Sequence, residues 1–214
     1  MPSIQFPRAV LVDMATVVAA LATSLTVPYG WPQVRRLRRT GDVTGVSIST
    51  TALSVASEVG WLIYLAGERL WPALPEALLT MVVNLVLTVS LLRAGAEWAI
   101  GAAAAGAWGI VLIGGRVVGG PPAIAVLLSV TYAVQLVPAV WTAWRVWCPT
   151  GVSASAWAVR FIQSALWAGY GLMRDDPPLV TLGAIGSVAS AVVLTRLVVT
   201  RARLTAAGAV TATS

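Results

Sequence analysis

The sequence contains no histidine and a single cysteine, Cys148, among its 214 residues. These absences exclude histidine-based metal sites and proton relays, catalytic triads that use histidine, and a disulfide bond within the chain. Charge is also scarce, because 10% of the residues are charged, against about a quarter in an average soluble domain. We therefore expect a protein that is not an enzyme and that needs no cofactor and no metal.

Hydrophobic residues make up 58% of the chain and recur in long runs. A helix of about 20 apolar residues spans the hydrocarbon core of a bilayer. Breaks at proline, glycine and charged residues divide the chain into seven such segments. The expected membrane-spanning helices are 8–31, 45–66, 75–93, 97–114, 122–144, 152–172 and 178–198. The sequence thus predicts an all-α integral membrane protein with seven transmembrane helices.

The basic residues, all of them arginine, give the chain a formal net charge of +6. They lie mostly at segment ends rather than on a basic face interleaved with aromatic residues, so they do not indicate a nucleic-acid partner. With the N-terminus outside, cytoplasmic segments hold nine arginines and outer segments hold four, in keeping with the positive-inside rule. The cluster from Arg35 to Arg39 then anchors the first cytoplasmic loop. We expect a plasma-membrane protein with its N-terminus outside and its C-terminus in the cytoplasm.

A shift of the sequence by 106 positions aligns two segments that share proline, glycine, tryptophan and tyrosine residues. The aligned pairs are Pro32 with Pro138, Gly45 with Gly151, Trp61 with Trp167, and Tyr64 with Tyr170. Several matches of these residue types at one offset, without a gap, indicate an internal repeat of a three-helix unit. Both copies begin outside and end inside, so the expected architecture is a 3+1+3 parallel repeat of three-helix bundles.

A fourth helix must return the chain to the outer side between the two copies. In this segment Gly101, Ala105 and Gly109 recur at every fourth position, which gives a smooth face for close helix packing. The predicted domains are a first three-helix bundle (1–94), a linker transmembrane helix (95–117), a second three-helix bundle (118–200) and a cytoplasmic tail (201–214).

The segment PQVRRLRRTGDVTGVSISTTALSVASEVGWLIYL, from Pro32 to Leu65, resembles the PQ-loop signature. That signature consists of Pro-Gln, a basic stretch, a turn of small residues with Gly and Ser, and an apolar helix that ends in Trp-x-x-Tyr. The 3+1+3 arrangement resembles the SWEET sugar transporters, and one copy resembles the bacterial SemiSWEET proteins. The second copy has Pro138 followed by Ala139, so its glutamine is absent.

The resemblance implies two three-helix bundles that face each other around one central pathway. It also implies that a proline in the first helix of each bundle helps that helix to bend, which assigns a hinge role to Pro32 and Pro138. Proline removes a backbone hydrogen bond and weakens a helix locally. The alternative is that both prolines mark cytoplasmic helix ends, where proline is also tolerated.

Trp61 and Trp167 match the pocket tryptophans that the resemblance implies, position for position. Sugar sites favour flat aromatic faces together with side chains that donate and accept hydrogen bonds. We therefore expect both rings to contact the solute. The alternative is that they are interfacial anchors near helix ends.

The functional asparagine pair of the SWEET family falls on Ala77 and Gly183 in this sequence. Asn84 lies about two helical turns beyond Ala77 on the same face, and its counterpart in the second copy is Ser190. An amide inside a membrane is costly unless it finds partners. We expect Asn84 and Ser190 to line the pathway, and a hydrogen bond between packed helices is the alternative.

Two ionisable residues fall well inside predicted membrane helices, Glu58 and Arg160. Glu58 follows Ser57 and shares a helical face with Trp61, while Arg160 and Gln163 occupy the corresponding face of the second copy. An intramembrane charge faces a cavity or a partner. We expect Ser57 and Gln163 to line the pathway, and Glu58 and Arg160 to act in gating or proton coupling. A structural ion pair, or an arginine that reaches the interface, is the alternative.

Three functions follow from these observations. The first is a SWEET-type uniporter that moves a small polar solute, a sugar by resemblance, through alternating access between two bundles. The second is a proton-coupled carrier of an amino acid or similar metabolite, for which Glu58 supplies the titratable carboxylate. The third is a PQ-loop membrane protein that does not transport. We expect the first, with the solute and the lipid bilayer as partners, and we leave an assembly of identical chains open.

Asp175 and Asp176 form the sole pair of adjacent acids in the chain. They precede Pro177 in a short turn between two predicted spans, and we interpret them as a solvated loop rather than as catalytic acids. No nucleophile lies beside an obvious base elsewhere, which again argues against an enzyme.

Overall fold

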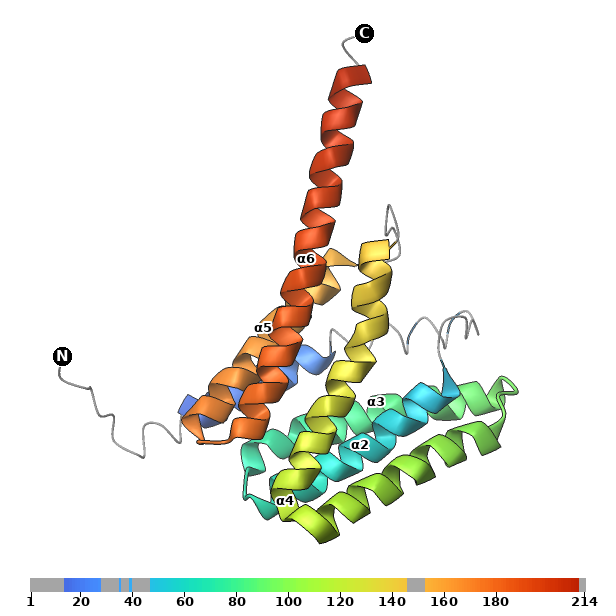
Figure 1. Cartoon of the computed structure of the whole chain (residues 1–214), viewed down its shortest axis with the longest axis vertical. Coiled ribbons are helices and arrows are strands. Elements are labelled where there is room, and N and C mark those ends of the chain that lie inside the picture. Colours follow the sequence, from blue (N-terminus) through green and yellow to red (C-terminus); the bar gives the residue numbers. More distant parts are fainter. Residues whose placement is uncertain (1–13, 28–34, 36–38, 40–46, 146–152, 212–214) are drawn as a thin grey trace, which may run out of the picture.

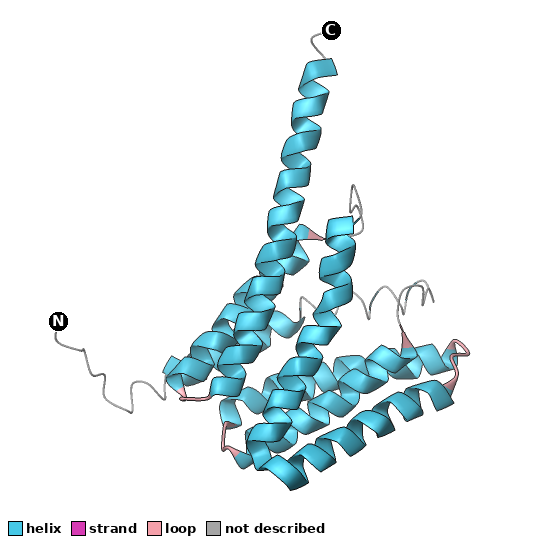
Figure 2. Ribbon diagram, viewed as in Figure 1, coloured by secondary structure: helices cyan, strands magenta, loops and turns pink. Residues whose placement is uncertain are grey.

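The computed structural model describes residues 14–27, 47–145 and 153–211, together with Arg35 and Arg39. All regular secondary structure in these residues is helical, as Figure 2 shows, which confirms the predicted all-α class. In chain order the helices are Met14–Val27, α2 (Ile48–Gly67), the 3-10 helix η1 (Trp71–Ala73), α3 (Leu74–Arg93), α4 (Trp98–Arg145), α5 (Ala154–Met173) and α6 (Pro177–Thr211).

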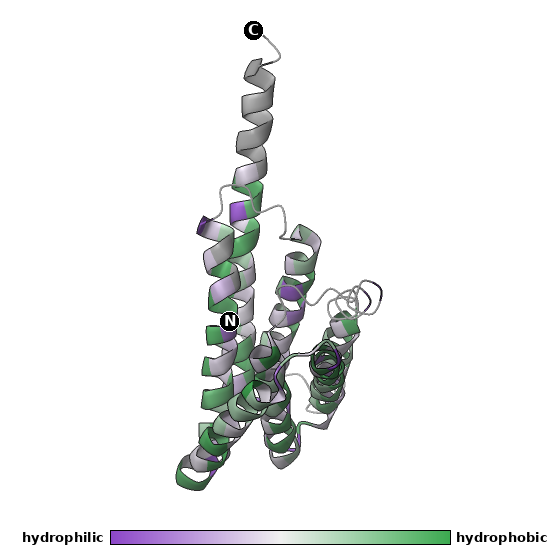
Figure 3. Cartoon of the chain, turned by 90° about the vertical axis from the view of Figure 1, so that its right-hand side faces the viewer, coloured by the Kyte–Doolittle hydropathy of each residue, from purple (hydrophilic) through white to green (hydrophobic). Residues whose placement is uncertain are grey.

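Four helical segments are long and apolar enough to cross a membrane: α2, the combined η1 and α3, α4, and Pro177–Thr200 of α6. Their surfaces expose large apolar side chains, such as Val118 and Val117, which are 90% and 79% exposed. Figure 3 shows that hydrophobic residues cover much of the helical surface. Soluble monomers rarely expose apolar patches of this kind, so the surface is compatible with a membrane protein.

Two predicted spans do not belong to this set of four. The helix Met14–Val27 is shorter than a bilayer span among the described residues. α5 has 20 residues but includes Arg160 and Gln163, whose polarity lowers its hydropathy. α5 is therefore not among the four candidate spans.

The helix α4 turns sharply at Gly120, where the sequence predicts a loop. Helix continues on both sides of this single residue, so Arg116, predicted in an outer connection, lies within a helix. Gly120 has φ 69° and ψ −161°, which suits a residue without a side chain. Pro121 and Pro122 then begin the second segment, where the absent N–H of proline costs no helical hydrogen bond. Figure 1 shows the two halves of α4, 98–119 and 121–145, diverging from this point.

Two further boundaries differ from the prediction. α6 continues as a helix to Thr211, so the predicted tail from position 201 begins within a helix. Pro138, one of the two predicted hinges, lies inside α4, where the backbone remains helical. Pro32, the other predicted hinge, lies outside the described residues.

The two aligned segments of sequence form the same local structure. α2 and α5 both contain 20 residues and begin 106 positions apart, at Ile48 and Ala154. Each helix has a serine N-cap: Ser47 accepts a hydrogen bond from the N–H of Thr50 at 3.5 Å, and Ser153 accepts one from Ala156 at 3.3 Å. The repeated serine thus caps the start of both helices.

The helices form two groups that meet near the start of α6 and diverge away from it (Figure 1). α2 packs against α3 and α4, whereas α5 packs against α6, and α4 also contacts α6. The N-terminal helix contacts α5, because Gln163 Nε2 donates hydrogen bonds to Thr26 Oγ1 (2.8 Å) and to the carbonyl of Ala22 (3.3 Å). The N-terminal helix, which belongs to the first sequence copy, therefore packs against a helix of the second copy.

Candidate functional site

A cavity of about 300 Å³ lies between the two groups of helices. This volume is at the lower end of the range for small-molecule sites, about 300–1,000 Å³. Residues of both sequence copies line it, and they come from the N-terminal helix, α2, α3, α4, α5 and α6. The cavity is therefore the candidate binding site.

Most of the predicted pathway residues lie together around this cavity. They are Trp61, Trp167, Asn84, Ser57, Gln163, Glu58 and Arg160. The structure brings them together around one cavity, although α2 and α5 are distant in the sequence. Their part in transport remains a prediction.

Ser190, the predicted counterpart of Asn84, does not line the cavity. It is completely buried on the face of α6 that also carries Val193 and Leu197, and these two residues pack against Ala143 at the end of α4. No described residue is a hydrogen-bond partner of the Ser190 hydroxyl. In this structure Ser190 thus faces a helix interface.

Asn84 does face the cavity, with its amide tied to its own helix. Asn84 Nδ2 donates a hydrogen bond to the carbonyl of Thr80, one turn earlier, at 3.0 Å. This bond accounts for one donor of the amide. The oxygen of the amide remains suited to a solute hydroxyl or ammonium group.

The different positions of Asn84 and Ser190 predict different reactivity of cysteines placed there, once Cys148 is replaced by serine. Asn84→Cys should react with a water-soluble thiol reagent, because its side chain borders the cavity. Ser190→Cys should be protected, since it is buried. Leu85→Cys, at an apolar position of α3 that is 48% exposed and does not line the cavity, is the control for membrane-facing residues. Protection of both Asn84→Cys and Leu85→Cys would contradict a water-accessible cavity.

The two tryptophans are held at equivalent places by their tyrosine neighbours. Trp61 contacts Tyr64 edge to face, with ring centroids 5.8 Å apart and an interplanar angle of 77°. Trp167 contacts Tyr170 in the same way, at 5.6 Å and 86°. Both tryptophans are at least nine-tenths buried, and no described residue accepts a hydrogen bond from either indole N–H. The rings are therefore rigid parts of the wall that retain an unused donor.

The first copy contributes two carboxylates to the cavity, of which the sequence predicted one. Glu58 lies on α2, and Glu76 lies in the first turn of α3. The two carboxyl groups are close enough to interact electrostatically. Glu76 Oε1 accepts a hydrogen bond from Thr80 Oγ1 at 3.1 Å, and Thr26 is a second hydrogen-bonding neighbour. Glu76 was missed because an acid in the first turn of a helix has an ordinary role beside the helix dipole.

The second copy contributes a cation and amides to the cavity. Arg160 on α5 has its guanidinium carbon 5.6 Å from the centroid of the Tyr132 ring and 5.7 Å from that of Trp157. Gln135 on α4 and Gln163 on α5 complete this part of the wall. Tyr132 and Gln135 were not predicted, although their spacing of three in an apolar helix could have identified a polar face.

The cavity is closed at one end by a hydrogen bond between the two copies. Tyr64 Oη donates to Asp176 Oδ2 at 2.8 Å, and Asp176 Oδ1 accepts from the N–H of Leu179 at 2.9 Å, which caps α6. Asp176 is 7% exposed, so its prediction as part of a solvated loop was wrong. A carboxylate can be buried here because both of its oxygens have donors.

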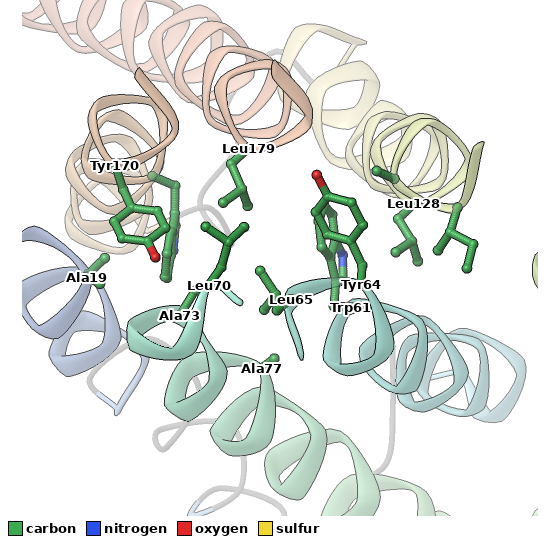
Figure 4. Close-up of a cluster of buried hydrophobic side chains, with 14 of the residues drawn as sticks. Ala19, Trp61, Tyr64, Leu65, Leu70, Ala73, Ala77, Leu128, Tyr170 and Leu179 are labelled. Carbon is green, nitrogen blue, oxygen red and sulfur yellow. The ribbon is translucent and has the colours of Figure 1, made fainter. Parts of the chain in front are cut away.

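The equivalent contact of the other copy lacks its acceptor. Tyr170 is completely buried, and its hydroxyl has no partner among the described residues. At the position equivalent to Asp176, 106 residues earlier, the first copy has Leu70, which is also buried. Figure 4 shows Tyr64 and Tyr170 near Leu179 and Leu70 respectively. At the closed end, the Tyr64 hydroxyl therefore has an acceptor, whereas the Tyr170 hydroxyl has none among the described residues.

The position where the SWEET pattern has an asparagine is too tight for any side chain in the second copy. A Cβ atom on Gly183 would clash with the backbone of α5, at Ala168 N and Ser164 O. The equivalent Ala77 on α3 is 1% exposed. Close helix packing therefore explains why small residues occupy both positions.

A search against models of protein families and a search of curated proteins each found no match to this chain. The likeness to the PQ-loop and SWEET proteins rests on the motif between Pro32 and Leu65 and on the internal repeat.

Proposed function

We propose that the chain is a membrane transporter that moves a small polar solute by alternating access between two three-helix bundles of the SWEET type. The observation that supports this most strongly is a cavity between the two sequence copies, in which Trp61 and Trp167 occupy equivalent places and polar side chains come from both copies. A transporter site between internal repeats has this arrangement.

In the proposed topology the N-terminus is outside and residues 98–119 form the linker helix of a 3+1+3 fold. The contact between Tyr64 and Asp176 then lies at the outer end of the cavity. Outward opening must separate these two side chains, because they belong to different bundles. In the proposed mechanism this contact belongs to a state in which the outer end is closed.

A sugar is the first candidate solute. Two buried aromatic rings, together with hydroxyl and amide side chains such as Ser57, Asn84 and Gln163, suit a flat polyol. The resemblance to SWEET proteins favours the same class.

A proton-coupled carrier of an amino acid or similar metabolite is the second candidate. The observation in its favour is that Glu58, Glu76 and Arg160 all border the cavity. Buried charges of this kind are costly and mark ion or substrate pathways.

Uptake by the purified chain in liposomes tests the proposal. We expect accumulation of at least one labelled solute from a panel of sugars and amino acids, assayed with and without a pH gradient. Acceleration by the gradient favours the coupled carrier, and equal rates favour the uniporter. Absence of uptake for every solute by folded protein would favour a membrane protein that does not transport.

A further inference from the structure

Two arginines lie where α4 and α6 pack side by side, away from the cavity. Arg145 is the last residue of α4, and Arg196 lies one helical turn before the end of the candidate span Pro177–Thr200. The two helices are in contact at this level, because Ala143 of α4 and Val193 of α6 belong to one buried cluster. The two positive charges therefore belong to the same end of this helix pair.

The lengths of the two helices place both arginines at a membrane surface. Arg196 follows Pro177, the first residue of α6, by a helical rise of about 29 Å. Trp141 follows Pro121, where the second half of α4 begins, by about 30 Å, and Arg145 lies one turn further. The hydrocarbon core of a bilayer is about 30 Å thick. Helices that start at one surface thus carry Arg145 and Arg196 to the level of the lipid headgroups at the other.

Each guanidinium group lies over the ring of a tryptophan. The guanidinium carbon of Arg145 is 4.1 Å from the centroid of the Trp141 ring, and that of Arg196 is 5.8 Å from the centroid of the Trp144 ring. Both rings are more than half exposed, as is usual for tryptophans at a membrane interface. A ring covers one face of a guanidinium group and leaves the N–H groups in its plane able to donate.

The positive charge at this end has no acidic counterpart among the described residues. Arg196 Nε is buried without a hydrogen-bond partner there, and no described carboxylate forms a salt bridge with either arginine. Between positions 121 and 214 the sequence has two acids, Asp175 and Asp176, which precede α6 at its opposite end. A buried donor without an acceptor is costly, and an anion from outside the chain would remove this cost.

Apolar side chains next to the arginines favour a lipid over a free anion. Val137 and Val134 lie about one and two turns before Trp141 on α4, toward the centre of the membrane, and both are exposed. An acyl chain along this face would cover apolar surface that a phosphate ion or an acidic peptide would leave bare. Basic residues between membrane helices at the cytoplasmic side are typical of sites for anionic headgroups.

We propose that an anionic phospholipid binds where α4 and α6 end, with its headgroup phosphate at Arg145 and Arg196 and an acyl chain along Trp141 and Val137. In the topology given above this lipid belongs to the cytoplasmic leaflet, and its binding does not depend on which solute the cavity takes. The phosphate contacts one arginine from each helix. The lipid therefore holds the ends of α4 and α6 together within the second copy.

Binding of phosphatidylglycerol and of phosphatidylcholine to purified full-length protein in detergent tests the proposal. Native mass spectrometry counts the bound lipids and gives their affinity. We expect phosphatidylglycerol to bind more tightly and to raise the unfolding temperature. Arg145→Gln and Arg196→Gln should each weaken its binding about fivefold, which corresponds to about 1 kcal/mol for one basic residue near an anionic surface. Arg93→Gln, at an exposed arginine that ends α3, is the matched control and should bind like the wild type.

Three outcomes would overturn this lipid site. Equal affinity for the two lipids would exclude recognition of the anionic headgroup. An equal loss of affinity in Arg93→Gln would show that any basic residue attracts the lipid. Equal stabilisation by sodium phosphate would assign a site for a phosphate ion instead. Arg145 is exposed at a helix end, so Arg145→Gln should fold and decides the test where Arg196→Gln does not.

Discussion

Replacement of either cavity tryptophan by alanine should reduce solute uptake by roughly tenfold or more. Trp61 and Trp167 each offer an aromatic face and an indole N–H to the cavity, and loss of one ring removes stacking worth about 1 kcal/mol as well as a donor. The measurement is the initial rate of uptake in liposomes at equal protein content. Both rings should matter, because both border the cavity.

Matched variants separate this effect from general destabilisation. Both tryptophans belong to the buried core, so their replacement by alanine also costs folding free energy, of the order of 3–5 kcal/mol. Trp61→Phe and Trp167→Phe keep a flat ring and should retain more activity than the alanine variants. Trp71→Ala, at a ring that is 57% exposed, should be neutral. Uptake at the wild-type rate by both folded alanine variants would show that these rings are not part of the site.

Changes at the closed end should shift the balance between open and closed states in opposite directions. Tyr64→Phe leaves Asp176 Oδ2 buried without its donor, which costs the closed state about 1–3 kcal/mol. Leu70→Asp supplies an acceptor near Tyr170, and position 70 is already the N-cap of η1, where aspartate is favoured. The first variant should open the outer end more often, and the second should keep it closed.

Thiol accessibility measures this shift. A cysteine at Ala73, a buried residue of the same cluster, should react faster with a water-soluble reagent in the Tyr64→Phe background, by about tenfold, and more slowly in the Leu70→Asp background. Leu70→Val, which adds no acceptor, is the control for the second variant. Equal reactivity in all backgrounds would show that these contacts do not hold the outer end closed.

Part of this site could be predicted because repetition is visible in sequence. The pairs Trp61 with Trp167 and Ser47 with Ser153 recur at one offset, and each pair has the same local structure. A match between residue types that recurs at one offset rarely arises by chance. The repeat therefore strengthens a sequence signal that is weak in either copy alone. Trp61 and Trp167 could be predicted as a pair for this reason.

Residues without a counterpart could not be predicted in this way. Glu76 aligns with Leu182, and Asp176 aligns with Leu70, so the comparison of copies gave no signal. Asp176 also lies in a short turn, where sequence alone indicates exposure, and it is the tertiary contact with Tyr64 that buries it. The asymmetric features of the site depend on contacts between the copies, which no single stretch of sequence encodes.

The prediction of a loop at residues 119–122 of α4 was also wrong, because the sequence Gly-Gly-Pro-Pro is typical of a loop. Helix on both sides makes Gly120 a corner instead. Pro121 and Pro122 are compatible with the first turn of a helix. The predicted break in the helix therefore exists, but it is one residue long rather than a loop.

This corner has a mechanical consequence for any movement of the two groups of helices. The first half of α4 is fixed to α2, since Trp108 Nε1 donates to Ser57 Oγ at 2.9 Å and Gly101 packs against Ile48. The second half contacts α6, where Tyr132 lies beside Gly186. Leu112 of the first half and Leu128 of the second both lie against Gly60, so α2 contacts both halves of α4. Because Gly120 is the residue of α4 whose backbone is not helical, we expect any change in the angle between the two halves to occur as rotation about its backbone bonds.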